Sequence, residues 1–198
     1  MPSVLVTGDA RELAFSNLSS VATDDRGGAA CAVEYLIKSG HRDFLVLGGH
    51  REQSDTSLQR YEGCMDAFAR NGLQFEEERY YTCRFSFQSG YETMKQALKS
   101  GISCTAVFAM ADVIAIGAIR AIREAGLRVP EDISVAGYDG LDVGDFLAPK
   151  LTTITQPTND LTGRSAAILL DQIQKAAEPV HVTIPFALSC KESVSRRG

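Results

Sequence analysis

The sequence contains no tryptophan, only three histidines and no long apolar run, and each absence narrows the class of protein. His41, His50 and His181 are scattered without the spacing of metal ligands, so no zinc or other metal site is expected. The apolar stretches are too short to span a bilayer. The start lacks a basic region followed by an apolar run, which argues against a signal peptide. These absences predict a soluble, cytoplasmic protein.

The five cysteines do not indicate a framework of disulfide bonds. They are odd in number, widely spread and never in a C-x-x-C pair: Cys31, Cys64, Cys83, Cys104 and Cys190. Each lies in an apolar run or on a helical face, which favours small, reduced core residues over disulfides. Reduced thiols suit a cytoplasmic compartment.

Positive charge is sparse as well. The formal net charge is −5 and the isoelectric point is near 5.2. A DNA-binding surface needs clustered Lys and Arg to neutralise phosphates, and no such cluster occurs. Arg196 and Arg197 form only a short basic end. This stretch of chain is therefore not expected to bind nucleic acid by itself.

Signatures of catalysis are missing too. The glycine pairs at residues 27–28 and 48–49 do not complete a dinucleotide-binding G-x-G-x-x-G. No nucleophile elbow of the G-x-S-x-G type is present. We therefore expect neither an enzyme nor a resident cofactor.

What the sequence does contain is a regular alternation of apolar strands and amphipathic helices. Residues 44–47 are a continuous apolar run, residues 105–108 and 133–136 are largely apolar, and each is followed by a helical or turn pattern. Such strands belong to parallel sheets that helices cover on both faces. The prediction is an α/β fold, and 198 residues suffice for one medium domain or two small lobes.

Parallel sheets bind ligands beyond the carboxyl ends of their strands, so residues just after each strand are candidate contacts. The candidates are Arg60, Phe85, Ala111, Asp112 and Asp139. Arg60 supplies a planar fork of donors, Asp139 a bidentate acceptor and Phe85 a flat apolar face. This combination is typical of a site for a polyhydroxylated small molecule.

Each candidate also has a purely structural interpretation. Asp112 can be a helix cap, and Arg60 can pair with Glu62 or an adjacent loop. Asp139 can serve as an Asx-turn residue. Phe85 can be a core residue. From the residues alone these alternatives stay open.

A family resemblance rests on residues 128–140, RVPEDISVAGYDG, and 148–157, APKLTTITQP. Three further segments fall in the expected order: residues 35–42 (YLIKSGHR), 60–63 (RYEG) and 108–117 (FAMADVIAIG). Together they resemble the effector-binding domain of LacI/GalR transcriptional regulators, across essentially the whole chain. The resemblance implies a type I periplasmic-binding-protein-like fold.

The resemblance also assigns roles to residues. It implies effector contacts at Arg60, Phe85 and Asp139, with Gln156 at a crossover between lobes and able to reach the ligand. The family commonly has asparagine where this chain has Ala111. The loss of that donor points to an effector other than a hexose held in the standard pose.

In this fold two lobes share the chain, and the first lobe is expected to be truncated. Residues 1–23 and 157–181 would form the partial N-terminal lobe. Residues 24–156 and 182–198 would form the C-terminal lobe. The DNA-binding headpiece of the family is absent from the sequence.

The helix expected from residue 112 is apolar nearly all round, which predicts burial on two sides. The resemblance implies a homodimer, with an interface at Ile116, Ile119, Arg120, Val143, Phe146 and Leu147. The alternative is burial under another part of the same chain.

The sequence therefore predicts the effector-sensing domain of a bacterial transcriptional repressor. A sugar or sugar derivative would bind between the lobes and change operator binding by the missing helix-turn-helix headpiece. The alternative is a sugar-binding protein of a transport system, which shares the fold and normally acts as a monomer.

Overall fold

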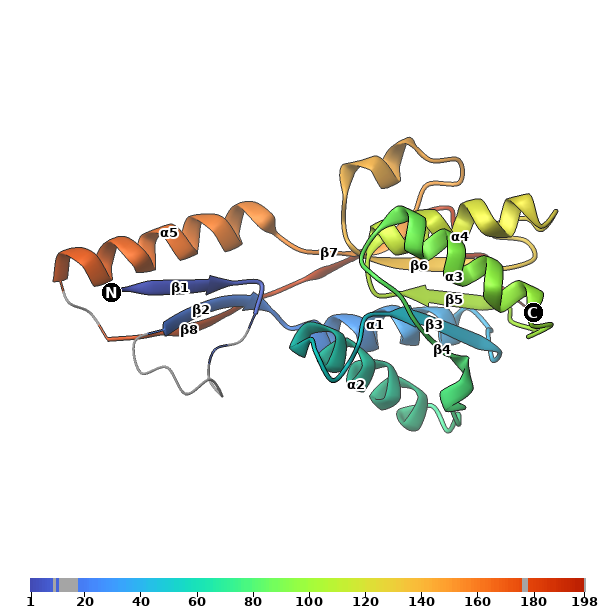
Figure 1. Cartoon of the computed structure of the whole chain (residues 1–198), viewed down its shortest axis with the longest axis horizontal. Helices are drawn as coiled ribbons and strands as arrows, with labels where there is room; N and C mark the ends of the chain where they lie inside the picture. The colour runs from blue at the N-terminus through green and yellow to red at the C-terminus, as the bar shows by residue number, and fades with distance from the viewer. Residues whose placement is uncertain (9, 11–17, 176–177, 198) are drawn as a thin grey trace. The chain divides into compact units, whose positions relative to one another are not determined.

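The structure is a computed structural model that describes residues 1–8, 10, 18–175 and 178–197 (Figure 1). The chain divides into two compact units. Unit 1 comprises Met1–Asp25 and Gln156–Phe186, and unit 2 comprises Arg26–Thr155 and Ala187–Gly198. Both units are therefore built from separated stretches of sequence.

Unit 1 is a small parallel sheet covered by one helix. Its strands lie in the order β1 (Ser3–Val6), β2 (Leu18–Thr23) and β8 (His181–Ile184). Helix α5 (Thr158–Lys175) packs on the sheet. The core of this unit is small: Leu161 and Ile168 of the helix lie against Val21 of β2.

The unit boundaries differ from the expected ones by a few residues. We expected residues from 182 onward to belong to the larger lobe, but β8 pairs with β2 and keeps the chain in unit 1 through Phe186. Asp24, Asp25 and Gln156 also group with unit 1. The position of a short strand depends on its pairing partner, which local sequence does not reveal.

Unit 2 is a six-stranded sheet with helices on both faces (Figure 1). The strands are β4 (Tyr80–Thr82), β3 (Phe44–Gly48), β5 (Ala106–Ala109), β6 (Ser134–Asp139), β7 (Thr152–Thr155) and β9 (Ala187–Ser189), in this spatial order. All pair in parallel except β9, which is antiparallel to β7. Helices α1 (Asp25–Lys38) and α2 (Asp55–Arg70) cover one face, and α3 (Phe87–Lys99) and α4 (Asp112–Glu124) cover the other.

The buried strands explain the apolar runs of the sequence. Every residue of β3 and β5 is buried, as is β6 up to Tyr138. A strand enclosed on both faces has no solvent side for polar residues, and it therefore shows no alternation. The α/β expectation of parallel sheets flanked by helices is confirmed.

Helix α4 is buried on two sides, as its composition predicts, and its second side contacts α3. The two helices approach closely because both carry glycine at the crossing. A Cβ on Gly117 would lie 2.2 Å from the Phe87 carbonyl oxygen, and one on Gly90 would lie 2.5 Å from that of Ile114. Burial within the same chain, the alternative to a subunit interface, thus accounts for most of this helix.

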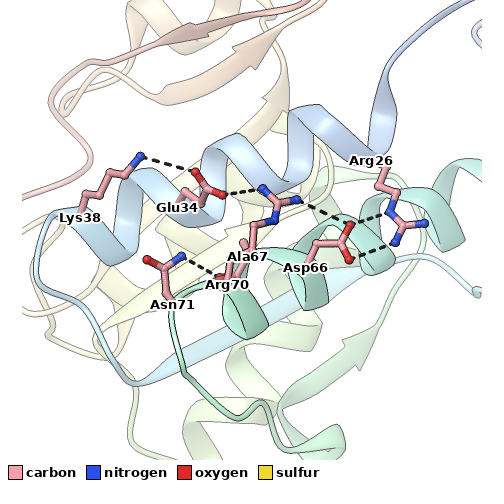
Figure 2. Close-up of polar contacts among 7 residues, drawn as sticks. All are labelled: Arg26, Glu34, Lys38, Asp66, Ala67, Arg70 and Asn71. Atoms are coloured by element: carbon pink, nitrogen blue, oxygen red, sulfur yellow. Dashed lines mark hydrogen bonds and ion pairs between the residues drawn. The ribbon is translucent and has the colours of Figure 1, made fainter.

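Helices α1 and α2 are joined by a network of ion pairs at their surface (Figure 2). Arg26 pairs with Glu62 at 2.8 Å and with Asp66 at 2.6 Å. Arg70 pairs with Glu34 at 2.8 Å. Exposed pairs of this kind contribute little stability individually.

The C-terminal tail, which begins at Ala187, packs into unit 2 through buried hydrogen bonds. Ser193 is fully buried; its hydroxyl donates to the Val135 carbonyl at 2.6 Å and accepts from the Thr152 amide at 2.8 Å. Ser195 bonds to Ser134 and Pro130. Among the described residues, no helix is both long and apolar enough to cross a membrane.

Candidate functional site

The candidate site lies at the carboxyl ends of the strands of unit 2, and Arg60 is its buried cation. Arg60 comes from α2 and is only 4% exposed. Its guanidinium lies over the Tyr138 ring, 3.6 Å from the centroid. It donates to the Met110 carbonyl and lies 3.6 Å from an Asp139 carboxylate oxygen. A buried guanidinium needs such partners, because removing its charge from water is otherwise costly.

Asp139, the last residue of β6, occupies an unusual backbone conformation. Its φ is 117°, in the region that favours glycine, and Gly140 follows with φ 77°. A non-glycine residue held at positive φ stores strain, and such residues cluster at functional sites. The carboxylate of Asp139 lies near Arg60 in this conformation, and both side chains were candidates from the sequence.

Asp112 does not occupy the capping position considered for it, and its contact with a ligand stays a prediction. It is fully buried at the start of α4, where Ala111 occupies the capping position without a side-chain cap. The Asp112 carboxylate accepts hydrogen bonds from the Thr153 hydroxyl at 2.6 Å and the Leu141 amide at 2.7 Å. Asp112 therefore holds the turn after Asp139 in place, a positioning role that replaces the expected helix cap.

Burial also changes the titration of this acid. Desolvation raises the pKa of Asp112 to about 6, although the hydrogen bonds from Thr153 and Leu141 act in the opposite direction. The carboxylate of Asp139 contributes further to the rise. A carboxyl with this pKa changes its charge close to neutral pH.

Phe85 follows β4 and remains half-exposed, so it is not the core residue that was its alternative. Its ring rests against Gly49, where a Cβ would lie 2.7 Å from the ring edge. Tyr80 donates to the Gly49 carbonyl at 2.5 Å and fixes this backbone from the other side. The flat face of Phe85 is thereby held at the strand ends without being buried.

Ala111 and Gln156 complete the predicted contacts. Ala111 follows β5 and is almost fully buried, so its contribution to the site is a small apolar surface. Gln156 belongs to unit 1, where its side-chain oxygen accepts from the Thr23 hydroxyl at 2.6 Å. The structure thus brings Arg60 and Asp139 together within unit 2, with Asp112 beneath their turn.

Sequence reasoning missed Tyr138 as the support for Arg60, and Thr153 and Gly28 entirely. A Cβ on Gly28 would lie 2.5 Å from the Tyr138 hydroxyl, so only glycine admits that ring. The sequence could have indicated Tyr138, because this aromatic residue directly precedes Asp139 at the end of a predicted strand. Thr153 carries no such signal, because it lies far from Asp112 in sequence.

The residues expected at a dimer interface fall into two groups. Ile119 is 4% exposed in the core of unit 2, and Ile116 and Leu147 pack against that core, so Ile119 is not an interface residue. Arg120 is exposed and pairs with Glu124. Of the expected interface residues, the exposed apolar ones are Phe146, which is 88% exposed, and Val143.

Among the described residues, no group of three or more His, Cys, Asp or Glu side chains is arranged to hold a metal. The candidate site instead combines a cation, an anion and aromatic faces. That set of groups offers paired donors and acceptors together with flat apolar faces.

Comparison with known proteins gives a consistent result. The profile of the periplasmic binding protein-like domain matches residues 33–194. The repressor PurR of Pasteurella multocida (strain Pm70) is 38% identical over 171 residues, which cover 86% of this chain and 51% of that protein. The regulator CelR of Thermobifida fusca is 32% identical over 177 residues, 89% of this chain and 52% of that protein. The chain thus spans about half the length of these relatives.

Solved structures agree in fold. A LacI-family regulator from Sanguibacter keddieii superposes with a TM-score of 0.90 at 29% identity, covering 97% of this chain and 73% of that one. A LacI-family regulator from Enterococcus faecium with bound ribose gives 0.84 at 32% identity, covering 91% and 67%. A complex of CelR with cellobiose gives 0.86 at 31% identity, covering 92% and 57%.

Proposed function

Because this chain belongs to the periplasmic binding protein-like family, as an effector-binding domain of the LacI type, we propose that its strand-end site binds a sugar or sugar derivative. The observation that carries the proposal is the pair formed by buried Arg60 and partly exposed Asp139. The positive φ of Asp139 and the burial of Arg60 both lower the stability of the folded state. Binding of a ligand through this pair would explain why these features are present.

The chemistry of the pair suits hydroxyl groups. A guanidinium offers several N–H donors in a fixed plane, and a carboxylate accepts in two directions. A sugar hydroxyl can donate to Asp139 while it or its neighbour accepts from Arg60. Phe85 adds a flat apolar face of the kind on which a sugar ring stacks.

Two of the similar structures support the ligand class, because one holds ribose and the other cellobiose. Ala111 further restricts which ligands the site would accept. It offers no polar side chain at the end of β5. The ligand of this chain is therefore expected to lack a polar group at that position, or to satisfy it elsewhere.

Regulation is the second part of the proposal. The full protein would act in the cytoplasm on operator DNA through a helix-turn-helix headpiece, and the relatives PurR and CelR are named HTH-type transcriptional regulators. Effector binding can shift DNA affinity only if the ligand binds one conformation more tightly than another. The contacts of Arg60 and Asp139 are the proposed source of this difference.

A homodimer is the third part. Phe146 and Val143 are exposed apolar side chains on the 3-10 turn Asp142–Phe146 of unit 2. Burying them, together with exposed Arg120, against a second copy would remove apolar surface from water. Sedimentation equilibrium of the chain and of Phe146→Ser tests this: dimer dissociation by the variant supports the interface, and an unchanged mass contradicts it.

The first experiment is thermal unfolding in the presence of ribose, cellobiose, other sugars, sugar phosphates, polyols and nucleosides. A ligand at a hundred times its dissociation constant adds about 2.7 kcal/mol to the stability of the folded state. A selective rise of the midpoint with a sugar supports the proposal. A rise with nucleosides alone would show that the ligand class is wrong.

A further inference from the structure

Arg51 lies in the loop between β3 and α2, and its guanidinium lies against two tyrosine rings. The centre of the guanidinium is 4.1 Å from the centroid of the Tyr61 ring and 4.6 Å from that of Tyr80. The two rings pack edge to face, 5.3 Å apart. Glu77 pairs with Arg51 and accepts a hydrogen bond from the Tyr61 hydroxyl at 2.8 Å. These four residues, the Arg51 cluster, lie outside the candidate site described above.

The Arg51 cluster joins three stretches of unit 2 that are separate in sequence. Arg51 belongs to the loop before α2, Tyr61 belongs to α2 itself, and the other two residues lie in the 3-10 turn Glu77–Arg79 and at the start of β4. The Arg51 side chain is 28% exposed, and a cation on an aromatic face is attracted more strongly as water is excluded. Because the guanidinium is planar, it can stack on the rings and pair with the carboxylate at the same time. The cluster therefore fixes the loop against both α2 and β4.

Tyr80 connects the cluster to Phe85. Its hydroxyl donates to the Gly49 carbonyl at 2.5 Å, and a Cβ on Gly49 would lie 2.7 Å from the Phe85 ring edge. The Cys83 amide donates to the Gly48 carbonyl at 2.7 Å, so the segment that leads to Phe85 is bonded to the same backbone. A shift of the loop at Gly49 would therefore move the support of the Phe85 ring.

Tyr80 also connects the cluster to Arg60. Its hydroxyl lies 3.9 Å from the Met110 sulfur, and the Met110 carbonyl accepts from the Arg60 guanidinium. Tyr61 directly follows Arg60 on α2, so the contact between Arg51 and Tyr61 acts on the helical turn that carries Arg60. One cluster thus contacts the supports of both the flat face and the buried cation of the candidate site.

We propose that Arg51 is a positioning residue of the effector site, which acts through Tyr80 to set the position of Phe85 relative to Arg60. The inference rests on the proposed function, because it assigns to Arg51 an effect on sugar affinity without contact between Arg51 and the sugar. A ligand binds most tightly when the stacking face and the hydrogen-bonding groups are held in place before it arrives.

A cluster that only stabilises the fold would behave differently. Its loss would lower the unfolding midpoint but leave the affinity of the folded chain unchanged. A positioning residue changes the affinity, and it does so only while the residue through which it acts is present. The two roles are therefore distinguished by binding measured on variants, and stability alone does not separate them.

The test is calorimetric titration with ribose and with cellobiose, using Arg51→Ala, Phe85→Leu and the double variant at a temperature where each is folded. Arg51→Ala removes the stacked cation and should weaken binding about tenfold. In the Phe85→Leu background the same change should weaken binding less than about twofold, because the flat face is already lost. Equal losses in both backgrounds, or an unchanged affinity of Arg51→Ala, overturn the proposal.

Arg26→Ala is the matched control. Arg26 also attaches α2 to a neighbouring segment, through Glu62 and Asp66, but its side chain is 47% exposed at the surface. This variant should keep its sugar affinity within about twofold of that of the unaltered chain. A loss equal to that of Arg51→Ala would show that any loosening of α2 weakens binding, which contradicts the role assigned to Arg51.

Hydrogen exchange of the whole chain without ligand separates this proposal from the proposed function. The amides of Cys83 and Arg84 are hydrogen-bonded and report on the segment before Phe85. Arg51→Ala should speed exchange at residues 83–86 as well as in the loop at 49–54, and Arg26→Ala should not. Unchanged exchange at 83–86 overturns the proposal. If neither sugar binds the unaltered chain, the ligand class is wrong, and exchange at 83–86 still decides whether Arg51 holds Phe85 in place.

Discussion

The guanidinium of Arg60 lies 3.6 Å from the centroid of the Tyr138 ring, directly beside its acidic partner Asp139. A cation on an aromatic face is attracted most strongly when water is excluded, and Arg60 is almost completely buried. The side chain is therefore held in position by the fold itself. A ligand that binds such a prepared group does not have to order it, which favours affinity.

Replacing Arg60 by lysine tests this arrangement. Arg60→Lys keeps the charge but loses the planar fork, so affinity for the sugar that raises the midpoint should fall at least tenfold. Stability should fall by about 1–3 kcal/mol as buried hydrogen bonds are lost. Calorimetric titration and urea unfolding measure both effects.

The control is Arg70→Lys on the exposed side of the same helix, where both quantities should stay within about 0.5 kcal/mol of the unaltered chain. Unchanged sugar binding by Arg60→Lys would remove Arg60 from the site.

The buried Asp112 should make stability fall as pH rises toward neutrality. Its pKa is raised from 3.8 to about 6 in the fold, so between these values the folded chain holds more protons than the unfolded chain. The free energy of unfolding therefore decreases as pH rises through this window. By the linkage relation the effect is at most about 3 kcal/mol. Urea unfolding of Asp112→Asn and the unaltered chain between pH 4 and 7 should show their difference changing in this sense.

The pKa of Asp132 is shifted in the opposite direction from that of Asp112. Hydrogen bonds from Arg128 lower its pKa to about 2, so its stabilising contribution is lost as pH falls below 3.8. The difference between Asp132→Asn and the unaltered chain should therefore vary only in the acid range. If the Asp112 and Asp132 variants show the same pH profile, the assignment to Asp112 fails.

The turn after β6 should not tolerate a side chain at Gly140. Its φ is 77°, and a Cβ would lie 2.7 Å from the Thr155 Cα atom. Gly101 has the same φ with nothing within 4 Å, so Gly101→Ala measures the backbone cost alone, about 1 kcal/mol. Gly140→Ala should lose at least 2 kcal/mol more in urea unfolding. Equal losses for the two variants would show that the turn can shift without cost.

The crossing of α3 and α4 makes a similar comparison possible. Gly117→Ala would place a methyl group 2.2 Å from the Phe87 carbonyl oxygen, so the helices must separate and stability should fall by about 2–4 kcal/mol. Gly163→Ala in α5 meets nothing within 4 Å and should instead stabilise by about 0.5–1 kcal/mol. Thermal unfolding of the two variants should therefore shift in opposite directions, and a shift in the same direction contradicts the packing argument.

Local patterns were sufficient to predict the main elements of unit 2. The apolar run at residues 44–47 is β3, and the helix expected from Asp112 is α4. The strand-end rule selected Arg60 and Asp139, which the structure brings together as an ion pair. The elements and the proximity of these two residues were predictable because burial and strand ends leave a signal in neighbouring residues, whereas ligand contact by Arg60 and Asp139 stays a prediction.

The remaining features depend on residues that are distant in sequence. Asp112 bonds to Thr153, and the second side of α4 meets α3 through Gly117 and Gly90. A single sequence contains no pattern that links such partners. The sequence therefore left capping and ligand contact open for Asp112, and left a subunit interface and burial within the chain open for the doubly apolar helix.

The packing of the C-terminal tail also affects when unit 2 can finish folding during synthesis. Residues 187–197 supply β9 and buried Ser193 to unit 2, yet they are synthesised after the rest of that unit, Arg26–Thr155. Chains fold from the N-terminal end as they emerge from the ribosome. Unit 2 must therefore wait, with the edge of β7 and the space for Ser193 unfilled, until these residues have emerged.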